Sequence, residues 1–248
     1  LESLITSKTK AILAVHLYGQ PCDMKSIKQI CDKHKLYLVE DCAQSHGSTY
    51  DGIMTGRFSD IGCFSFYPSK NLGAFGDAGA IVTDNSELAD KIRVLRNYGS
   101  EKRYYNEVVG YNSRLDELQA GLLRVKLKYL DELNKERIDI AKRYLSEVDN
   151  PKIILPKILD KAMPIWHLFV VRVKDRAEFM SYLNECNIGS VIHYPIPPHL
   201  SKAYEYLGYK EGDYPITESY ANEVVSLPIY NGMTKEEVDY AIKCLNKY

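Results

Sequence analysis

The sequence has no excess of charge of either sign and no long apolar run. Its 248 residues include 32 Lys and Arg against 33 Asp and Glu, for a formal net charge of −1. A chain so balanced offers no basic surface of the kind that binds nucleic acid or an anionic membrane. No apolar stretch approaches the roughly 18 to 20 residues that a membrane-spanning helix needs. These absences argue against a nucleic-acid partner and against a membrane location.

Paired cysteines and a leader segment are also missing. The six cysteines are dispersed, and no two of them are separated by just two residues. The sequence therefore lacks the spacing typical of zinc sites and of dithiol redox motifs, so we expect no metal. The chain begins without the basic and apolar segments of a signal peptide. We expect a reducing, cytoplasmic setting.

Apolar runs alternate with helical patterns over the first third of the chain. The runs at 10–16, 36–41, 61–66 and 79–83 are typical of buried strands. Asp23 stands where it can cap a helix between the first two runs. Such alternation predicts an α/β fold with a mainly parallel sheet flanked by helices. In sheets of this kind, ligands bind at the carboxyl ends of the strands.

The C-terminal half predicts a second, smaller α/β domain. A long helical pattern runs from 114 to about 148, with Leu115 and Leu122 on its apolar stripe. We expect this helix to lead from a large cofactor-binding domain, 1–128, into a small domain, 129–248. The small domain is predicted to contain strands at 166–171 and 189–193, a helix at 176–187, and a last helix capped by Thr234 and Glu237.

Lys70 and Asp41 are the residues that point to chemistry. Lys70 lies in a glycine-rich turn between two apolar runs, and Asp41 closes another apolar run. Each residue alone is most often a solvated surface charge or a strand cap. Together they match the needs of pyridoxal phosphate, in which a lysine amine forms a Schiff base and a carboxylate partners the pyridine nitrogen. Lysine suits this role because desolvation readily lowers its pKa.

Five short motifs sharpen this interpretation. They occur in the order 15–20 (VHLYGQ), 40–47 (EDCAQSHG), 65–70 (SFYPSK), 110–114 (GYNSR) and 119–120 (QA). With these motifs the chain resembles the nucleotide-sugar aminotransferases of the DegT type, which are fold type I pyridoxal-phosphate enzymes. The form of loop 67–77 (YPSKNLGAFGD) is most similar to members that aminate dTDP-3-keto-6-deoxyhexoses. The resemblance also implies that an N-terminal portion, with a phosphate-binding loop and a ring-stacking aromatic residue, is absent from this sequence.

The resemblance implies a role for each motif residue. Lys70 would be the Schiff-base lysine and the proton carrier, and Asp41 would partner the pyridine nitrogen. Gln44 would lie beside the ring at its phenolic oxygen, and Ser65 would bind the phosphate. Asn112 would reach the phosphate of the neighbouring subunit's cofactor, which implies a homodimer with shared active sites.

Three further positions carry weaker expectations. His16 either contacts the cofactor or simply ends its strand, and both alternatives remain open. His193 with Tyr194 is expected to line the sugar site, from the small domain or from the partner subunit. Ala78 stands where the family most often has glycine; a positive φ at this position would cost alanine about 1 kcal/mol.

The implied activity is transfer of an amino group to a keto-sugar nucleotide. The donor would be an amino acid, expected to be glutamate, and the product a deoxyamino sugar for a lipopolysaccharide, an S-layer glycan or an antibiotic. A sugar-nucleotide dehydratase of the same family is one alternative, but those relatives have histidine in place of the lysine, so Lys70 favours transamination. A non-catalytic regulator that binds cofactor or sugar nucleotide is another, and retention of both Lys70 and Asp41 argues against it.

Overall fold

The chain folds as two units, each with its own sheet, in a computed structural model that describes residues 1–248. The first unit consists of Leu1–Asn134 and Ile158–His167, and the second of Lys135–Lys157 and Leu168–Tyr248. The boundary predicted from the sequence, after residue 128, falls a few residues before the end of the first segment. The segment Ile158–His167 returns to the first unit, which no local pattern in the sequence indicates.

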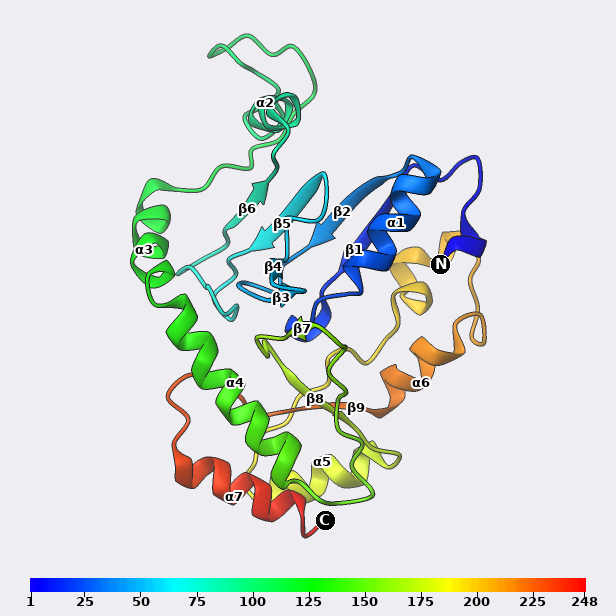
Figure 1. Cartoon of the computed structure of the whole chain (residues 1–248), viewed down its shortest axis with the longest axis vertical. Helices are drawn as coiled ribbons and strands as arrows, with labels where there is room; N and C mark the ends of the chain where they lie inside the picture. The colour runs from blue at the N-terminus through cyan, green and yellow to red at the C-terminus, as the bar shows by residue number, and fades with distance from the viewer. The chain divides into compact units, whose positions relative to one another are not determined.

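The first unit is built on a four-stranded sheet in the order β1-β2-β5-β6 (Figure 1). Its strands are β1 (Ala11–Val15), β2 (Tyr37–Asp41), β5 (Ile61–Ser65) and β6 (Gly79–Val82). The first three are parallel, and β6 runs antiparallel to β5. The predicted mainly parallel sheet is therefore confirmed, and every strand begins and ends within one residue of its predicted range.

Helix α1 (Met24–His34) covers one face of this sheet. The Asp23 carboxylate accepts a hydrogen bond from the Ser26 N–H at 3.2 Å and so caps the helix, as predicted. The buried side of α1 packs on Ala14 of β1 and Leu38 of β2. Burial of these apolar groups stabilises the layer of helix on sheet.

The opposite face of the sheet is open in this chain. Leu13 is 61% exposed and Val15 is 43% exposed, and both belong to β1, the edge strand of this sheet. Asp41 pairs with Val15 in register, so its side chain lies on the same open face. Successive residues of a strand point to opposite faces. Glu40 therefore points to the face that α1 covers.

A smaller sheet and one further helix complete most of the first unit. The antiparallel strands β4 (Ile53–Met54), β3 (Thr49–Tyr50) and β7 (Ala162–Met163) lie side by side in that order. Helix α2 (Ser86–Leu95) follows β6, and the Asn85 side chain caps it by accepting from two backbone N–H groups. The loop that follows α2 projects away from the sheet (Figure 1, top).

The predicted single helix from 114 to 148 is wrong, because the structure has two helices. They are α3 (Glu117–Leu127) and α4 (Leu130–Glu147). Between them the N–H of Lys128 bonds to Val125 and that of Tyr129 to Lys126, so each bond spans three residues instead of four. This tighter turn interrupts the helix without any proline or glycine. Helix α4 begins in the first unit and continues into the second.

The second unit has a two-stranded antiparallel sheet of β8 (Phe169–Arg172) and β9 (Val224–Leu227). Its helices are α5 (Arg176–Glu185), α6 (Pro215–Glu223) and α7 (Lys235–Leu245). The predicted capping box of α7 is confirmed, since Thr234 accepts from the Glu237 N–H and Glu237 accepts from the Thr234 N–H. Four short 3₁₀ helices complete the chain: η1 (Glu2–Leu4), η2 (Leu17–Gly19), η3 (Pro198–Leu200) and η4 (Lys202–Leu207).

The predicted strand at 189–193 is not formed. Only Val191 pairs with β9, by two hydrogen bonds to Ser226. Pro195, Pro197 and Pro198 follow at once, and a proline has no N–H to donate to a ladder. The segment therefore contributes an isolated bridge instead of a strand.

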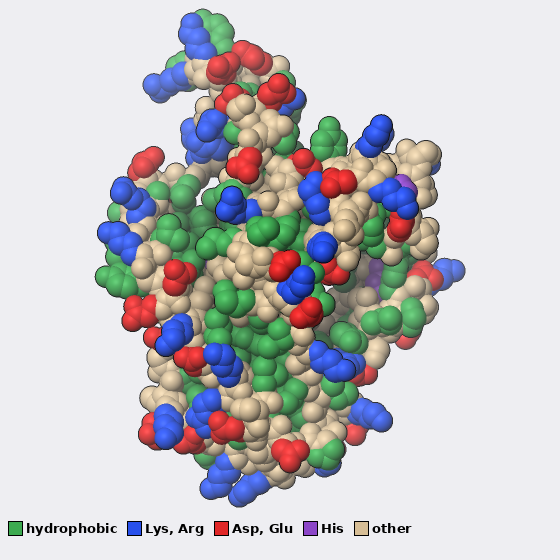
Figure 2. Space-filling model, viewed as in Figure 1, with side chains coloured by type: hydrophobic (Ala, Val, Ile, Leu, Met, Phe, Trp, Pro, Cys, Tyr) green, Lys and Arg blue, Asp and Glu red, His purple; other side chains and the backbone are tan.

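None of the helices combines the length and apolar composition needed to cross a bilayer. On the face shown in Figure 2, acidic and basic side chains are mixed with one another and surround uncharged areas. The balance of charge in the sequence is therefore also a balance in space on this face, with no field of one sign to attract a polyanion.

Candidate cofactor site

Asp41 is the last residue of β2, at the carboxyl end of a parallel strand. Its Oδ1 accepts a hydrogen bond from the Ala43 N–H at 2.9 Å. Its other carboxylate oxygen accepts none from the protein. An acid with one oxygen held and one oxygen available is oriented but still able to bind a donor. The strand end is also where sheets of this type bind ligands.

Lys70 lies in the turn after β5. Its backbone N–H donates to the Tyr67 carbonyl at 2.8 Å, while its ammonium makes neither a hydrogen bond nor an ion pair. Partial burial lowers the pKa of the Lys70 ammonium below its ordinary value, and the nearby charge of Asp41 opposes this shift only in part. A lower pKa leaves more of the amine neutral, and the neutral amine is the nucleophile.

Close contacts fix the loop that follows Lys70. A Cβ added to Gly73 would lie 2.3 Å from the Pro68 carbonyl oxygen, so only glycine fits there. The Lys126 ammonium donates to the Gly73 carbonyl at 2.8 Å, and Gln119 accepts from the Phe75 N–H at 2.9 Å. Both side chains come from α3. The glutamine of the QA motif thus has a structural role in holding this loop.

Ala78 does not pay the conformational cost that a positive φ would impose on alanine. The backbone of Ala78 is not among the residues with positive φ. Its carbonyl accepts a hydrogen bond from the Phe66 N–H at 2.8 Å, in line with the ladder between β5 and β6. The family's usual glycine is therefore not required by the backbone at this position.

Ser65 and Gln44 lie near the same edge of the sheet. The Ser65 hydroxyl oxygen accepts from the Tyr67 N–H at 3.3 Å, and its own proton has no acceptor in the structure. It can therefore donate to an anion. Gln44 is buried, and its Oε1 accepts from the Tyr18 N–H at 2.6 Å. This bond joins the motif at 40–47 to the motif at 15–20.

His16 has no ring nitrogen left for a cofactor. Its side chain is 0% exposed. Its Nδ1 accepts from the Cys22 N–H at 3.1 Å, so its Nε2 carries the proton and donates to Glu40 Oε1 at 3.0 Å. Of the two alternatives left open by the sequence, the geometry favours the one in which His16 ends its strand and supports the fold.

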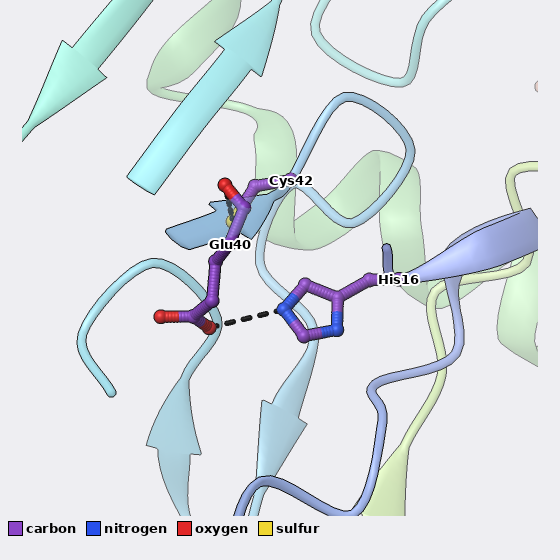
Figure 3. Close-up of side chains that lie close together, drawn as sticks. All are labelled: His16, Glu40 and Cys42. Atoms are coloured by element: carbon purple, nitrogen blue, oxygen red, sulfur yellow. Dashed lines mark hydrogen bonds and ion pairs between the residues drawn. The ribbon is translucent and has the colours of Figure 1, made fainter. Parts of the chain in front are cut away.

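Glu40 is the acceptor at the centre of a saturated network (Figure 3). Its Oε1 also accepts from the Gly56 N–H at 2.8 Å, and its Oε2 accepts from the Phe58 N–H at 3.0 Å and the Ser59 hydroxyl at 2.7 Å. Burial by itself raises the pKa of Glu40, but these hydrogen bonds together with that from His16 outweigh it and lower the pKa. Glu40 is therefore a buried, ionised and fully paired carboxylate.

His16, Glu40 and Cys42 present their ligand atoms within 4.8 Å of one another, as a metal site would. The histidine and carboxylate atoms are already engaged in the network just described. Burial, helped by the charge of Glu40, raises the pKa of the Cys42 thiol to about 12. A protonated thiol beside saturated ligands cannot bind a cation without dismantling the network. The cluster is a structural element of the fold.

His46 is a functional candidate that the sequence did not single out. Its Nε2–H donates to the Ser65 carbonyl at 2.8 Å, while its Nδ1 is buried without any hydrogen-bond partner. Burial lowers the pKa of His46 to about 4, and the positive charge of Lys70 acts in the same direction. His46 is therefore neutral near pH 7. The only signal in the sequence is its place in the EDCAQSHG motif.

The remaining predicted residues lie elsewhere. Asn112 is on the exposed loop after α2, where it bridges Asn97 and lines a hollow with Asp77, Arg96 and Arg114. Its predicted contact with a partner's phosphate stays a prediction. Within the first unit, the structure thus brings Asp41, Ser65 and Lys70 to the sheet edge and leaves Asn112 apart on the projecting loop.

His193 and Tyr194 belong to the second unit. The His193 Nδ1 and the Ser226 hydroxyl are 2.7 Å apart, and the Tyr194 ring lies edge-on to the imidazole with centroids 5.4 Å apart. Tyr194 is 51% exposed. His193 also lines a surface hollow with Tyr230 and Tyr240. Their predicted role in sugar binding stays a prediction.

Comparison with known proteins decides the family. The model of the DegT/DnrJ/EryC1/StrS aminotransferase family matches residues 1–246. The chain belongs to this family. The family resemblance drawn from the five motifs is therefore confirmed, and so is the aminotransferase-type α/β fold.

Two relatives act on dTDP-sugars according to their names. The dTDP-3-amino-3,6-dideoxy-alpha-D-galactopyranose transaminase of Aneurinibacillus thermoaerophilus is 54% identical over the whole chain, which covers 68% of that protein. The dTDP-3-amino-3,4,6-trideoxy-alpha-D-glucose transaminase of Streptomyces venezuelae is 49% identical over 92% of the chain, which covers 61% of that protein. The chain thus spans about two thirds of the length of these family members.

Solved structures share the same fold. The crystal structure of S. venezuelae DesV in complex with a ketimine intermediate has a TM-score of 0.97 and 46% identity, over 99% of this chain and 67% of that one. The crystal structure of ntda from Bacillus subtilis, with bound cofactor pmp, has a TM-score of 0.87 and 36% identity, over 99% of this chain and 57% of that one.

Proposed function

We propose that this chain forms the cofactor-binding part of a pyridoxal-phosphate-dependent aminotransferase that acts on a keto-sugar nucleotide. One observation carries the proposal. Lys70 and Asp41 are charged groups at the ligand-binding edge of the sheet, and neither is neutralised by an ion pair in the protein. The Lys70 pKa is lowered by burial and responds to the charge of Asp41, so the two groups share one electrostatic environment.

The groups left unpaired fit the three parts of this cofactor. The amine of Lys70 suits the aldehyde, and the available oxygen of Asp41 suits a protonated pyridine nitrogen. The hydroxyl proton of Ser65, which has no acceptor in the protein, suits the phosphate. The Gln44 side chain, held by the Tyr18 N–H, would orient beside the ring. Each of these residues was predicted from the sequence, and their assignment to the cofactor is our proposal.

The residues divide the work of amino transfer. Pyridoxal phosphate, when bound, supplies an aldehyde that takes up an amino group and a ring that accepts the electrons of a broken C–H bond. Lys70 would hold the cofactor through its amine, and it is placed to move a proton to or from the substrate carbon. Asp41 would bind the ring nitrogen, and Ser65 would bind the phosphate.

We further propose a dTDP-3-keto-6-deoxyhexose as acceptor and glutamate as donor. The form of the loop after Lys70 and the names of the two dTDP-sugar transaminases support this choice. The test is product analysis of the intact enzyme with a panel of 3-keto and 4-keto sugar nucleotides. We expect an amino group at C3 with the dTDP-3-keto sugar and no amino product from the Lys70→Ala variant.

The same panel separates the alternatives. A deoxygenated product without nitrogen would identify a dehydratase. Cofactor binding without turnover of any sugar would favour a regulator, a role that the name of one relative suggests: the pleiotropic regulatory protein of Geobacillus stearothermophilus, 41% identical over the whole chain. Amination at C4 alone would retain the aminotransferase and reject the proposed substrate.

We propose a homodimer with shared active sites as the working unit. The support is the exposed loop after α2, which carries Asn112 together with the largely exposed rings of Tyr104 and Tyr105. A two-fold partner could use this loop twice, once at each site. A purified mixed dimer of one Asn112→Ala chain and one Lys70→Ala chain should then contain one intact site and one doubly altered site.

We expect this mixed dimer to regain about half of the parent activity, because one of its two symmetric sites is complete. Each variant homodimer should be impaired, which provides the baseline. A mixed dimer with no more than half the activity of the Asn112→Ala homodimer would place Asn112 in its own subunit's site. An unimpaired Asn112→Ala homodimer would place it outside any site.

The cytoplasmic setting is likewise a proposal. All six cysteines are free in the structure, as a reducing compartment would leave them. Peptide mapping of protein isolated under alkylating conditions should find all six cysteines of this chain as free thiols. Oxidised pairs would argue for an oxidising compartment.

A further inference from the structure

A buried chain of side-chain hydrogen bonds begins at the residue after Lys70. The Asn71 Nδ2 donates to Asn134 Oδ1 at 2.8 Å and to the Ile165 carbonyl at 3.2 Å. The Asn71 Oδ1 lies 3.2 Å from His167 Nδ1, and the Asn134 Nδ2 donates to the His46 carbonyl at 2.7 Å. All of these groups belong to the first unit.

The network pairs both the nitrogen and the oxygen of the Asn71 amide. Its oxygen accepts one hydrogen bond and its nitrogen donates both protons, which gives the amide a single orientation. The side chains of Asn71, Asn134 and His167 are all less than 10% exposed. A buried amide whose every group is paired cannot rotate without leaving donors and acceptors unsatisfied. The position of the backbone at residue 71 is therefore fixed.

This fixation matters for Lys70 because nothing else holds its ammonium. The ammonium has no ion pair and no hydrogen bond, and a flexible four-carbon chain joins it to the backbone. The contacts from α3 act farther along the loop, at Gly73 and Phe75. The turn bond from the Lys70 N–H to Tyr67 sets the local shape but does not tie the turn to the rest of the unit. Asn71 supplies that tie directly beside Lys70.

We propose that Asn71 is a positioning residue, whose amide, locked by Asn134 and His167, sets where the Lys70 amine stands at the edge of the sheet. The inference rests on the proposed function of Lys70. The contacts join residues 63 to 96 positions apart in the sequence, so they tie the turn to segments that the chain reaches only much later. Because reacting groups must be held within a fraction of an ångström, loosening this tie lowers the rate more than it weakens substrate binding.

The test compares three variants of the intact enzyme. Asn71→Ala and Asn134→Ala remove the network from its two sides. Asn150→Ala is the matched control, because Asn150 also donates to one carbonyl, that of Leu245 at 2.8 Å, and accepts from one backbone N–H, but it lies in the second unit. The first readout is the split between kcat and KM. The second is the rate at which pyridoxal phosphate followed by borohydride labels Lys70, measured by peptide mapping without any turnover.

We expect both network variants to lower kcat by roughly 10- to 100-fold with less than about a twofold change in KM. Labelling of Lys70 should slow in both variants, and Asn150→Ala should match the parent in both readouts. Combining Asn71→Ala with Asn134→Ala should cost little more than either alone, because the two residues act as one network.

Other outcomes separate the two proposals. Label on a different lysine in the parent enzyme would overturn the proposed function itself. Label on Lys70 in the parent, with kcat and labelling rate in the folded variants equal to those of Asn150→Ala, would overturn the positioning role alone. Should Asn71→Ala fail to fold, Asn134→Ala decides the matter, since it leaves residue 71 unchanged.

Discussion

Glu40 and Asp41 are neighbouring carboxylates of one strand, and the fold treats them in opposite ways. Glu40 points to the covered face of the sheet, where both of its oxygens accept two hydrogen bonds each. Asp41 points to the open face, where one oxygen accepts a single hydrogen bond and the other accepts none. Chemical type and place in the sequence are nearly the same, so the difference comes from the surroundings alone.

The comparison teaches how to separate supporting charges from reactive ones. Around Glu40 every donor and acceptor is satisfied within the protein, so the group is held for stability and has no capacity left for a ligand. Asp41 and Lys70 have charged groups without an ion-pair partner in the protein, so both are available to a ligand. Charged side chains without a full set of partners in the protein are what distinguish the proposed site from the network around Glu40.

The largest effect is expected from a substitution of Asp41, on the open face of the sheet. Asp41→Asn keeps the size of the side chain but removes the charge that would hold a proton on the cofactor ring. We expect turnover to fall by about three orders of magnitude, as for other groups that stabilise developing charge, while the free energy of unfolding of the apoenzyme changes by less than about 0.5 kcal/mol. Steady-state kinetics and denaturant unfolding measure the two quantities separately.

A variant with near-parent turnover would show that Asp41 is structural, and the contrast with Glu40 would disappear. The isosteric change also controls for packing, because asparagine can still accept from the Ala43 N–H.

For Glu40, on the covered face of the sheet, we expect a loss of stability with little change in turnover. Glu40→Gln replaces two acceptor sites by an amide group that faces donors, and it leaves buried N–H groups unpaired. We expect a loss of about 2 to 3 kcal/mol in the free energy of unfolding, with kcat per folded molecule close to that of the parent. Denaturant unfolding of the apoenzyme, followed by kinetics on the folded fraction, would test this. Unchanged stability would mean that the network is not what holds this part of the fold.

The strands of the first unit could be predicted closely because each is a buried apolar run bounded by polar turns, which is a local signal. The break between α3 and α4 could not, because no proline or glycine marks it and the three-residue hydrogen bonds depend on surrounding contacts. The strand expected at 189–193 did not form, although the segment is apolar. Prolines without an N–H follow it at once, and only Val191 pairs with β9, at Ser226.

The site divides in the same way. Lys70, Asp41 and Ser65 could be proposed from the sequence because they stand in short motifs that suggest their chemistry. The roles of His16 and Asn71 could not, because they depend on partners 24 and 96 residues away, respectively, in the sequence. The sequence does not tell which of Glu40 and Asp41 has all of its hydrogen bonds satisfied within the protein. That depends on which side chain points to the face of the sheet that α1 covers.

The smallest expected effect concerns His46, which is intermediate between the fully hydrogen-bonded Glu40 and the incompletely hydrogen-bonded Asp41. One of its ring nitrogens is paired and the other is buried and unpaired. Its pKa is about 4 in the folded protein against an ordinary value of 6.5. Between these values the unfolded chain binds the proton and the folded one does not, so stability present above pH 6.5 is lost as the pH falls toward 4.

His46→Phe should flatten this part of the curve of unfolding free energy against pH, because phenylalanine cannot titrate and its ring suits the neighbouring Phe64 and Phe66. Denaturant unfolding of parent and variant at several pH values between 4 and 7 measures the difference. Parallel curves would show that folding does not lower the pKa of His46, and that the proton on its buried nitrogen finds an acceptor when the ring is charged.

The most direct measurement of the central claim is the identity of the lysine that binds the cofactor. The intact enzyme, loaded with pyridoxal phosphate, is reduced with borohydride, digested and mapped by mass spectrometry. We predict a single pyridoxyl group on the peptide that contains Lys70, and its absence in the Lys70→Ala variant. A label on any other lysine, or a loaded enzyme that yields no labelled lysine, would contradict the assignment of this sheet edge as the active site.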